Sequence, residues 1–131
     1  MKHFLTTTIM AIAFTLIPAA LFAAAPVTLE GEFQGANCIF YNKTCPHNMT
    51  DGHIALEPDF VFVLGNGKYV FVPNLDRGLK IKYLHSNIKV IGKQAGDSVR
   101  AETVKVKENG KFKTVWSLAA QEEERRMMDQ K

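Results

Sequence analysis

Two cysteines and two histidines stand close together in the first half of the chain and are its best candidates for chemistry. Cys38, Cys45, His47 and His53 fall within sixteen residues, in a segment that also holds Met49. Thiolate, thioether and imidazole groups are the ligands that copper and zinc prefer in proteins. One interpretation is therefore a metal site on Cys38, Cys45, His47 and His53, with copper or zinc as its cofactor.

The same two cysteines also suit a structural disulfide. They are the only cysteines in the chain, and six residues separate them. An even cysteine count in an exported domain favours a disulfide framework, and closing so short a loop contributes about 2–3 kcal/mol. A redox-active pair normally has two intervening residues. We therefore expect a Cys38–Cys45 disulfide and no cofactor, with the metal site as the alternative and a reactive redox pair in third place.

Other residue types form no catalytic arrangement that the sequence reveals. Ser86, Ser98 and Ser117 stand in no nucleophile motif. No two acidic residues have a spacing that reliably places their carboxylates together, and Gly65-Asn66-Gly67 is typical of a turn rather than a phosphate-binding loop. We expect His85 at the end of a short helix, either as a favourable charge at the helix C-terminus or as a surface residue. The sequence leans away from an enzyme without deciding the question.

The first 25 residues have the layout of a secretory signal peptide. Lys2 and His3 give a weakly basic start, an apolar run covers residues 9–22, and three alanines follow at 23–25. The run is shorter than the roughly 20 residues that a membrane-spanning helix needs. We predict that residues 1–25 are a signal peptide, that the mature chain is periplasmic or secreted, and that it holds no transmembrane segment. The alternative is an uncleaved membrane anchor, because sequence alone does not prove cleavage.

Charge is unevenly distributed along the predicted mature chain. Residues 68–116 hold eleven basic and four acidic side chains, whereas residues 26–67 hold one basic and five acidic. The basic half could dock an acidic partner, but lysines on the outer faces of strands are also ordinary protection against aggregation. We favour the ordinary interpretation, and we expect an unknown protein or a small ligand as partner and no nucleic acid.

Alternation of apolar residues and turn residues predicts mostly strands. Residues 34–52 are predicted to be a loop, with a short strand possible at 38–41. Residues 60–64 and 68–72 flank Gly65-Asn66-Gly67 and predict a β-hairpin, and Asn109-Gly110 predicts a second one. The remaining predicted elements are strands at 27–33, 87–93, 99–107 and 112–116, a short helix within 75–84, and a helix from its cap Ser117 to about Met128.

Strand alternation also predicts a core. We expect eight side chains to point into one interior: Phe60, Phe62, Tyr69, Phe71, Val90, Val104, Val106 and Trp116. The alternative for the four aromatic residues of the first hairpin is an exposed platform that stacks on a ligand.

The element order predicts a mainly β fold, a small antiparallel barrel of the oligonucleotide/oligosaccharide-binding (OB) type with a short inserted helix and a C-terminal helix. The barrel would cover residues 26–116 and the helix 117–131. The run Phe71-Val72-Pro73-Asn74, the short helix, residues 88–93 and residues 104–106 together resemble small exported bacterial OB-like domains. This resemblance implies the fold and no catalytic residue. The resulting expectation is an exported, non-enzymatic accessory or binding domain with a disulfide-pinned loop; the alternative is a periplasmic metal-binding protein.

Overall fold

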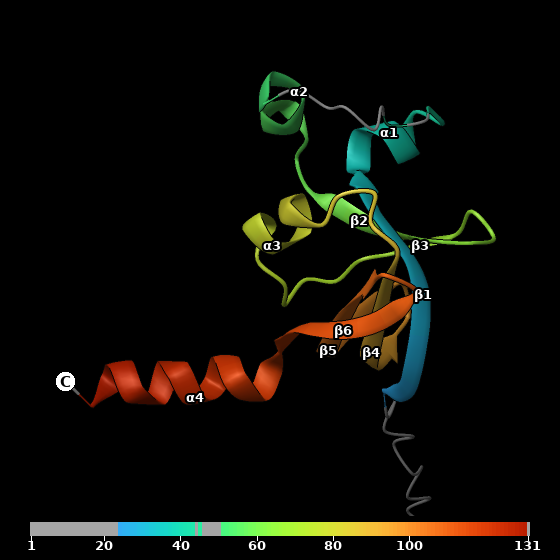
Figure 1. The fold of residues 1–131 in the computed structure, drawn as a ribbon. Helices are drawn as coiled ribbons and strands as arrows, with labels where there is room; N and C mark the ends of the chain where they lie inside the picture. The colour runs from blue at the N-terminus through green and yellow to red at the C-terminus, as the bar shows by residue number, and fades with distance from the viewer. Residues whose placement is uncertain (1–23, 44, 46–50, 131) are drawn as a thin grey trace, which may run out of the picture.

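The computed structural model describes residues 24–43, 45 and 51–130, and Figure 1 shows their arrangement. The predicted signal peptide up to residue 23 and His47 therefore lie outside the described residues. In chain order the elements are β1 (Ala25–Gly35), α1 (Ala36–Phe40), α2 (Asp51–Leu56), β2 (Phe60–Leu64), β3 (Tyr69–Val70), α3 (Arg77–Lys82), β4 (Ile88–Ala95), β5 (Ser98–Glu108), β6 (Lys111–Ser117) and α4 (Leu118–Asp129). The predicted mainly β fold is thus confirmed.

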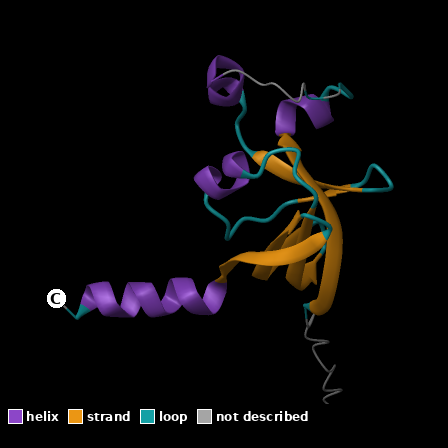
Figure 2. Cartoon of the chain, viewed as in Figure 1, coloured by secondary structure: helices purple, strands orange, loops and turns teal. Residues whose placement is uncertain are grey.

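The strands form one antiparallel sheet in the order β3-β2-β1-β4-β5-β6. β1 is the long central strand, and it curves through the sheet (Figure 2). Its first part pairs with β4 and its second part with β2, and Gly31 is the residue that pairs with both neighbours. A Cβ atom on Gly31 would lie 2.0 Å from the carbonyl oxygen of Val63, so the strands approach closely here because residue 31 has no side chain.

One further pairing lies outside the named strands. Phe71, directly after β3, forms an isolated parallel bridge with Ser98 at the start of β5. The Phe71 N–H donates to the carbonyl of Asp97 and the Val99 N–H donates to the carbonyl of Phe71, each over 2.8 Å. This bridge brings the β3 end of the sheet next to β5.

The core lies on the inner face of the curved sheet. Its buried members are Phe33, Phe62, Val70, Val72, Leu75, Ile88, Val90, Val99, Ala101, Val104 and Val106, with Trp116 among the partly buried side chains packed against them. Phe33 and Phe62 meet edge to face, with ring centroids 5.3 Å apart. Phe60 is also fully buried, beneath the Arg77 guanidinium. The prediction for Phe60, Phe62, Val90, Val104 and Val106 is therefore confirmed.

The prediction that Tyr69 and Phe71 belong to this interior is wrong. Tyr69 is 37 % exposed and Phe71 is half-buried, whereas Val70 and Val72 are buried. The predicted three-residue turn at 65–67 is present, with the Leu64 N–H donating to the Lys68 carbonyl. A loop of that length places Phe62 opposite Val70, and cross-strand partners share a face. The odd-numbered residues of the second strand therefore face outward.

The segment at 34–52 also differs from the prediction. It contains α1 and the beginning of α2. The sequence allows a short strand at 38–41, but α1 occupies most of these residues. The first two amides of α1 find distant partners: Ala36 N–H donates to the Asp59 carbonyl over 3.0 Å, and Asn37 N–H donates to the Glu57 carboxylate. Such partners satisfy the free N–H groups of a helix start, but short-range sequence patterns do not reveal them.

The remaining helices and the second hairpin agree with the sequence. Asp76 caps α3 by accepting from the Leu79 N–H over 2.8 Å, and Ser117 caps α4 by accepting from the Ala120 N–H over 3.3 Å. Asn109 and Gly110 have positive φ angles of 50° and 78°, as a tight hairpin requires. In Figure 1, α4 projects away from the sheet. Within the described part of the chain, no helix has the length and apolar character needed to cross a membrane.

Candidate functional site

A disulfide joins α1 to the segment that follows it. The sulfur atoms of Cys38 and Cys45 are bonded, and their Cα atoms lie 5.4 Å apart, within the roughly 4.4–6.8 Å that disulfides allow. Cys45 is buried and Cys38 is half-buried. The bond ties the middle of α1 to Cys45, which packs with its sulfur 4.0 Å from the Gly35 carbonyl. The expected Cys38–Cys45 disulfide is present.

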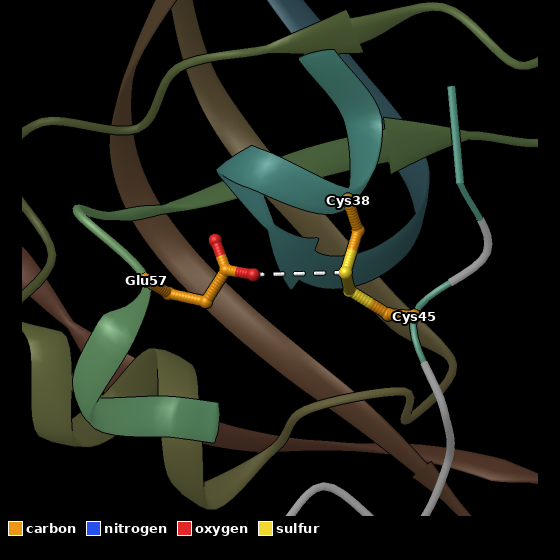
Figure 3. A group of neighbouring side chains, drawn as sticks. All are labelled: Cys38, Cys45 and Glu57. Atoms are coloured by element: carbon orange, nitrogen blue, oxygen red, sulfur yellow. Dashed lines mark hydrogen bonds between the residues drawn. A yellow bond between two sulfur atoms is a disulfide. The ribbon is translucent and has the colours of Figure 1, made fainter. Parts of the chain in front are cut away.

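Glu57 is a buried carboxylate beside this disulfide. Its Oε1 lies 3.6 Å from Cys38 Sγ, as the dashed line in Figure 3 marks, and its Oε2 accepts from the Asn37 N–H over 2.7 Å. A disulfide sulfur has no hydrogen to donate, so the first contact becomes a hydrogen bond only after reduction. A Cβ atom on Gly35 would lie 2.4 Å from the Glu57 carboxyl carbon, so Gly35 makes room for the carboxyl group. Sequence analysis missed this role, because the partners lie about twenty residues apart.

The structure brings only part of the predicted metal-ligand set together. Among the described residues, one ligand atom from each of Cys38, Cys45 and Glu57 lies within 4.8 Å of the others. His53 is exposed on α2 and does not belong to this group. While the two sulfurs are bonded to each other, neither is a thiolate that could hold a metal ion. Reduction would place two thiols beside a carboxylate.

A groove of about 550 Å³ crosses the outer face of β1. One wall is the β2–β3 hairpin, and the other is the chain segment between α3 and β4. Its lining residues are Glu30, Gly31, Glu32 and Gln34 from β1, Val63, Leu64, Gly65 and Gly67 from the hairpin, and His85 and Asn87 from that segment. The volume falls in the range of small-ligand sites, and the lining is rich in hydrogen-bonding groups.

Two carboxylates face this groove from one strand. Glu30 and Glu32 are two residues apart on β1, so their side chains leave the same side of the sheet. The Glu30 Oε1 is 2.8 Å from Lys89 Nζ, and the Glu32 carboxylate accepts from the Gln34 side-chain amide. Sequence spacing alone does not reveal this pair, because the tertiary fold decides which side of β1 lies open. Each carboxylate thus has a partner that orients it.

His85 reaches the groove through an unusual backbone conformation. Its φ angle is +57°, in the left-handed region that few residues other than glycine adopt, and its N–H donates to the Phe33 carbonyl over 3.1 Å. His85 is half-buried and lies three residues after the end of α3. This conformation lets the chain leave α3 and enter β4 while lining the groove.

An aromatic row, which we define as Phe40, Tyr69 and Phe71, lies beside the groove. Phe40 on α1 and Tyr69 have ring centroids 5.8 Å apart, and Tyr69 and Phe71 are again 5.8 Å apart, both pairs edge to face. Phe40 is 52 % exposed. Tyr69 is the cross-strand partner of Val63, which lines the groove. The row and the groove therefore adjoin on one face of the sheet.

Comparison of the chain with protein-family models, with curated proteins and with solved structures finds no match. No family membership is therefore assigned to it. The disulfide cluster, the groove and the aromatic row are the observations on which a function must rest.

Proposed function

We propose that this chain is an exported, non-enzymatic binding domain whose ligand face combines the groove and the aromatic row. The observation that carries the proposal is the pairing of Val63 with Tyr69. Antiparallel partners direct their side chains to the same face, so the groove and the exposed ring of Tyr69 are adjacent. Exposed aromatic groups next to a groove that offers hydrogen-bonding groups are typical of ligand sites rather than of inert surface.

The chemistry of this face favours a small polyhydroxylated ligand, such as a neutral sugar chain. Glu30, Glu32 and Gln34 offer oxygen atoms that accept hydrogen bonds from hydroxyl groups. Tyr69 and Phe40 offer ring faces and edges to an apolar ligand surface. The two carboxylates repel phosphate groups, which disfavours nucleic acid as the ligand.

Export and an OB-like barrel are part of the same proposal. A disulfide persists in oxidising compartments, which supports a location outside the cytoplasm together with the signal-like residues 1–25. The parallel bridge between Phe71 and Ser98 supports a barrel in which the β3 end of the sheet meets β5. The inserted helix α3 lies between β3 and β4, in agreement with the resemblance to exported bacterial OB-like domains.

The disulfide has a definite part in this function. Cys38 is two residues before Phe40 on α1, a helix of only five residues that is not stable by itself. The Cys38–Cys45 bond and the Glu57 contact to Asn37 fix this short helix against β1. They therefore fix the position of Phe40 in the aromatic row.

Titration with neutral oligosaccharides, followed by backbone amide NMR, tests the proposal. We would use cellohexaose, chitohexaose and maltohexaose as probes and expect at least one to shift amides of Glu32, Val63 and Tyr69. Tyr69→Ala and Glu32→Gln are each expected to weaken that binding by about tenfold, equivalent to about 1.4 kcal/mol. The matched control is Tyr41→Ala, because Tyr41 is a 71 % exposed aromatic residue outside the row.

Two results would contradict the proposal. One is that no probe shifts these amides at millimolar concentration. The other is that Tyr41→Ala weakens binding as much as Tyr69→Ala does, since this would show that any exposed ring suffices.

A second candidate function rests on the closeness of Cys38, Cys45 and Glu57. In the reduced state, two thiolates and a carboxylate would suit zinc or copper, as in the predicted metal-binding alternative. Native mass spectrometry of protein purified from an oxidising compartment distinguishes the two states. Bound metal with two reduced thiols supports metal binding; a mass two hydrogens lower with no metal supports the binding domain.

A further inference from the structure

The outer face of β4 and β5 carries two pairs of like charges. On β4, Ile88, Val90 and Gly92 are buried, so the alternate residues Lys89 and Lys93 lie on the outer face. The cross-strand partner of Lys89 is Lys105, and the partner of Lys93 is Arg100. Directly opposed partners in an antiparallel pair have Cβ atoms roughly 4.5–5.5 Å apart. Two pairs of cations are therefore held side by side, four positions apart on β4, and Lys107 lies farther along β5.

This arrangement costs stability that the sheet recovers only in part. Like charges directly opposite each other are destabilising. Two carboxylates offset part of the charge: Glu30 lies 2.8 Å from Lys89, and Glu102 lies 3.7 Å from Lys93. In the described part of the chain, no carboxylate lies within 4.0 Å of the other three cations, Arg100, Lys105 and Lys107. A local rule that is broken with only partial compensation is typical of a functional surface.

We infer that these five residues, Lys89, Lys93, Arg100, Lys105 and Lys107, form a basic strip that binds a linear anionic polysaccharide. From Arg100 to Lys107 the strip runs roughly 23 Å along β5 at about 3.3 Å per residue, and it is only two strands wide. Figure 1 shows β4 and β5 next to each other, beside β6 and away from α1 and α2. A long, narrow array of cations matches a chain of carboxylate or sulfate groups lying along the strands better than it matches a planar membrane surface.

The Phe112 ring beside the strip disfavours single-stranded nucleic acid. Phe112 on β6 is the cross-strand partner of Lys107. The Lys89 ammonium lies 4.2 Å from the centre of its ring and the Lys107 ammonium 5.8 Å. These cations compete for the ring faces on which a base would stack. Charge, rather than stacking, is what this surface offers a ligand.

Binding of fluorescent heparin and of fluorescent polygalacturonate, measured by anisotropy at low and at physiological NaCl, tests the inference. We expect both to bind, with affinity that falls as salt rises. Lys105→Glu should weaken binding by about tenfold, because it replaces an attraction with a repulsion. The same change places opposite charges across from each other at Lys89, so the melting temperature should stay the same or rise. The matched control is Lys68→Glu in the β2–β3 turn, an equal charge change on an exposed residue outside the strip.

Several results would overturn the inference. They are no binding of either polysaccharide at low salt, equal weakening by Lys105→Glu and Lys68→Glu, or tighter binding of an oligo-dT strand or of phosphatidylglycerol vesicles than of both polysaccharides. If Lys105→Glu lowers the melting temperature, Arg100→Glu replaces it as the test variant, because the exposed Arg100 side chain can be changed without disturbing the core. Arg100→Glu should also weaken binding by about tenfold, and unchanged binding would contradict the strip.

Discussion

Replacing Phe62 with alanine, beside a matched Tyr69→Ala variant, tests the register of the first hairpin and with it the division between core and ligand face. Phe62 is fully buried and meets Phe33 edge to face across β1 and β2. Tyr69 lies seven positions later on the partner strand, but its side chain is on the opposite face and 37 % exposed. The sequence prediction placed both rings inside, so it implies that both variants lose much stability. The structure implies a large loss of stability for Phe62→Ala alone.

The expected magnitudes are far apart. Truncating a buried phenylalanine to alanine costs about 3–5 kcal/mol, of which the contact between the two rings accounts for about 0.5–1.5 kcal/mol. Truncating a partly exposed residue such as Tyr69 costs about 1 kcal/mol or less. With an unfolding entropy of about 0.2 kcal/mol/K for a domain of this size, Phe62→Ala should lower the melting temperature by about 15–25 °C, and Tyr69→Ala by about 5 °C at most.

Thermal unfolding followed by circular dichroism, with urea unfolding as a second measure, provides the assay. A Phe33→Ala and Phe62→Ala double-mutant cycle isolates the energy of the ring pair. The reasoning is refuted if Phe62→Ala leaves the melting temperature unchanged, or if Tyr69→Ala lowers it as much as Phe62→Ala. The second result would mean that Tyr69 is packed in the interior and that the aromatic row does not face solvent.

Three further predictions concern stability, each measured by urea unfolding. Cys38→Ser should cost about 2–3 kcal/mol, as expected for opening a loop with a sequence separation of 7, while the NMR signals of the core stay in place. Asp59→Asn should lower the free energy of unfolding by about 1–3 kcal/mol. The Lys80 side chain is only 3 % exposed, and its ammonium group would lose the carboxylate 2.9 Å away. Gly31→Ala should cost about 3 kcal/mol or more, because the new methyl group would overlap a carbonyl of β2, whereas Gly65→Ala, in open space, should cost less than about 1 kcal/mol.

Local sequence signals predicted most of the elements, because each of those elements depends on nearby residues. Alternating apolar residues mark β4 and β5, Asn109-Gly110 supplies the positive φ angles of its turn, and Ser117 supplies the cap of α4. The sequence did not predict which side chains of β3 point outward, for a different reason. Both strands of the first hairpin are apolar at nearly every position, so composition does not distinguish inside from outside. Only the length of the turn, which pairs Phe62 with Val70, sets the register.

The candidate site was less predictable because its contacts are distant in the sequence. The Cys38–Cys45 bond was expected from cysteine number and spacing. The partner that completes this cluster is Glu57, nineteen residues after Cys38, and no spacing rule connects the two. The groove likewise depends on which strands flank β1, and His85 enters it only because its backbone adopts a left-handed conformation.

The groove and the basic strip meet at a single ion pair. Glu30 lines the groove, Lys89 belongs to the basic strip, and the two are cross-strand partners as well as 2.8 Å apart. Opposite charges directly across a strand pair stabilise the sheet, so this contact allows an acidic region and a basic region to lie next to each other on the outer face. A change at either residue alters the charge of both regions at once. Glu32→Gln and Lys105→Glu each alter one region alone, and for this reason the two proposed ligands can be confirmed or refuted separately.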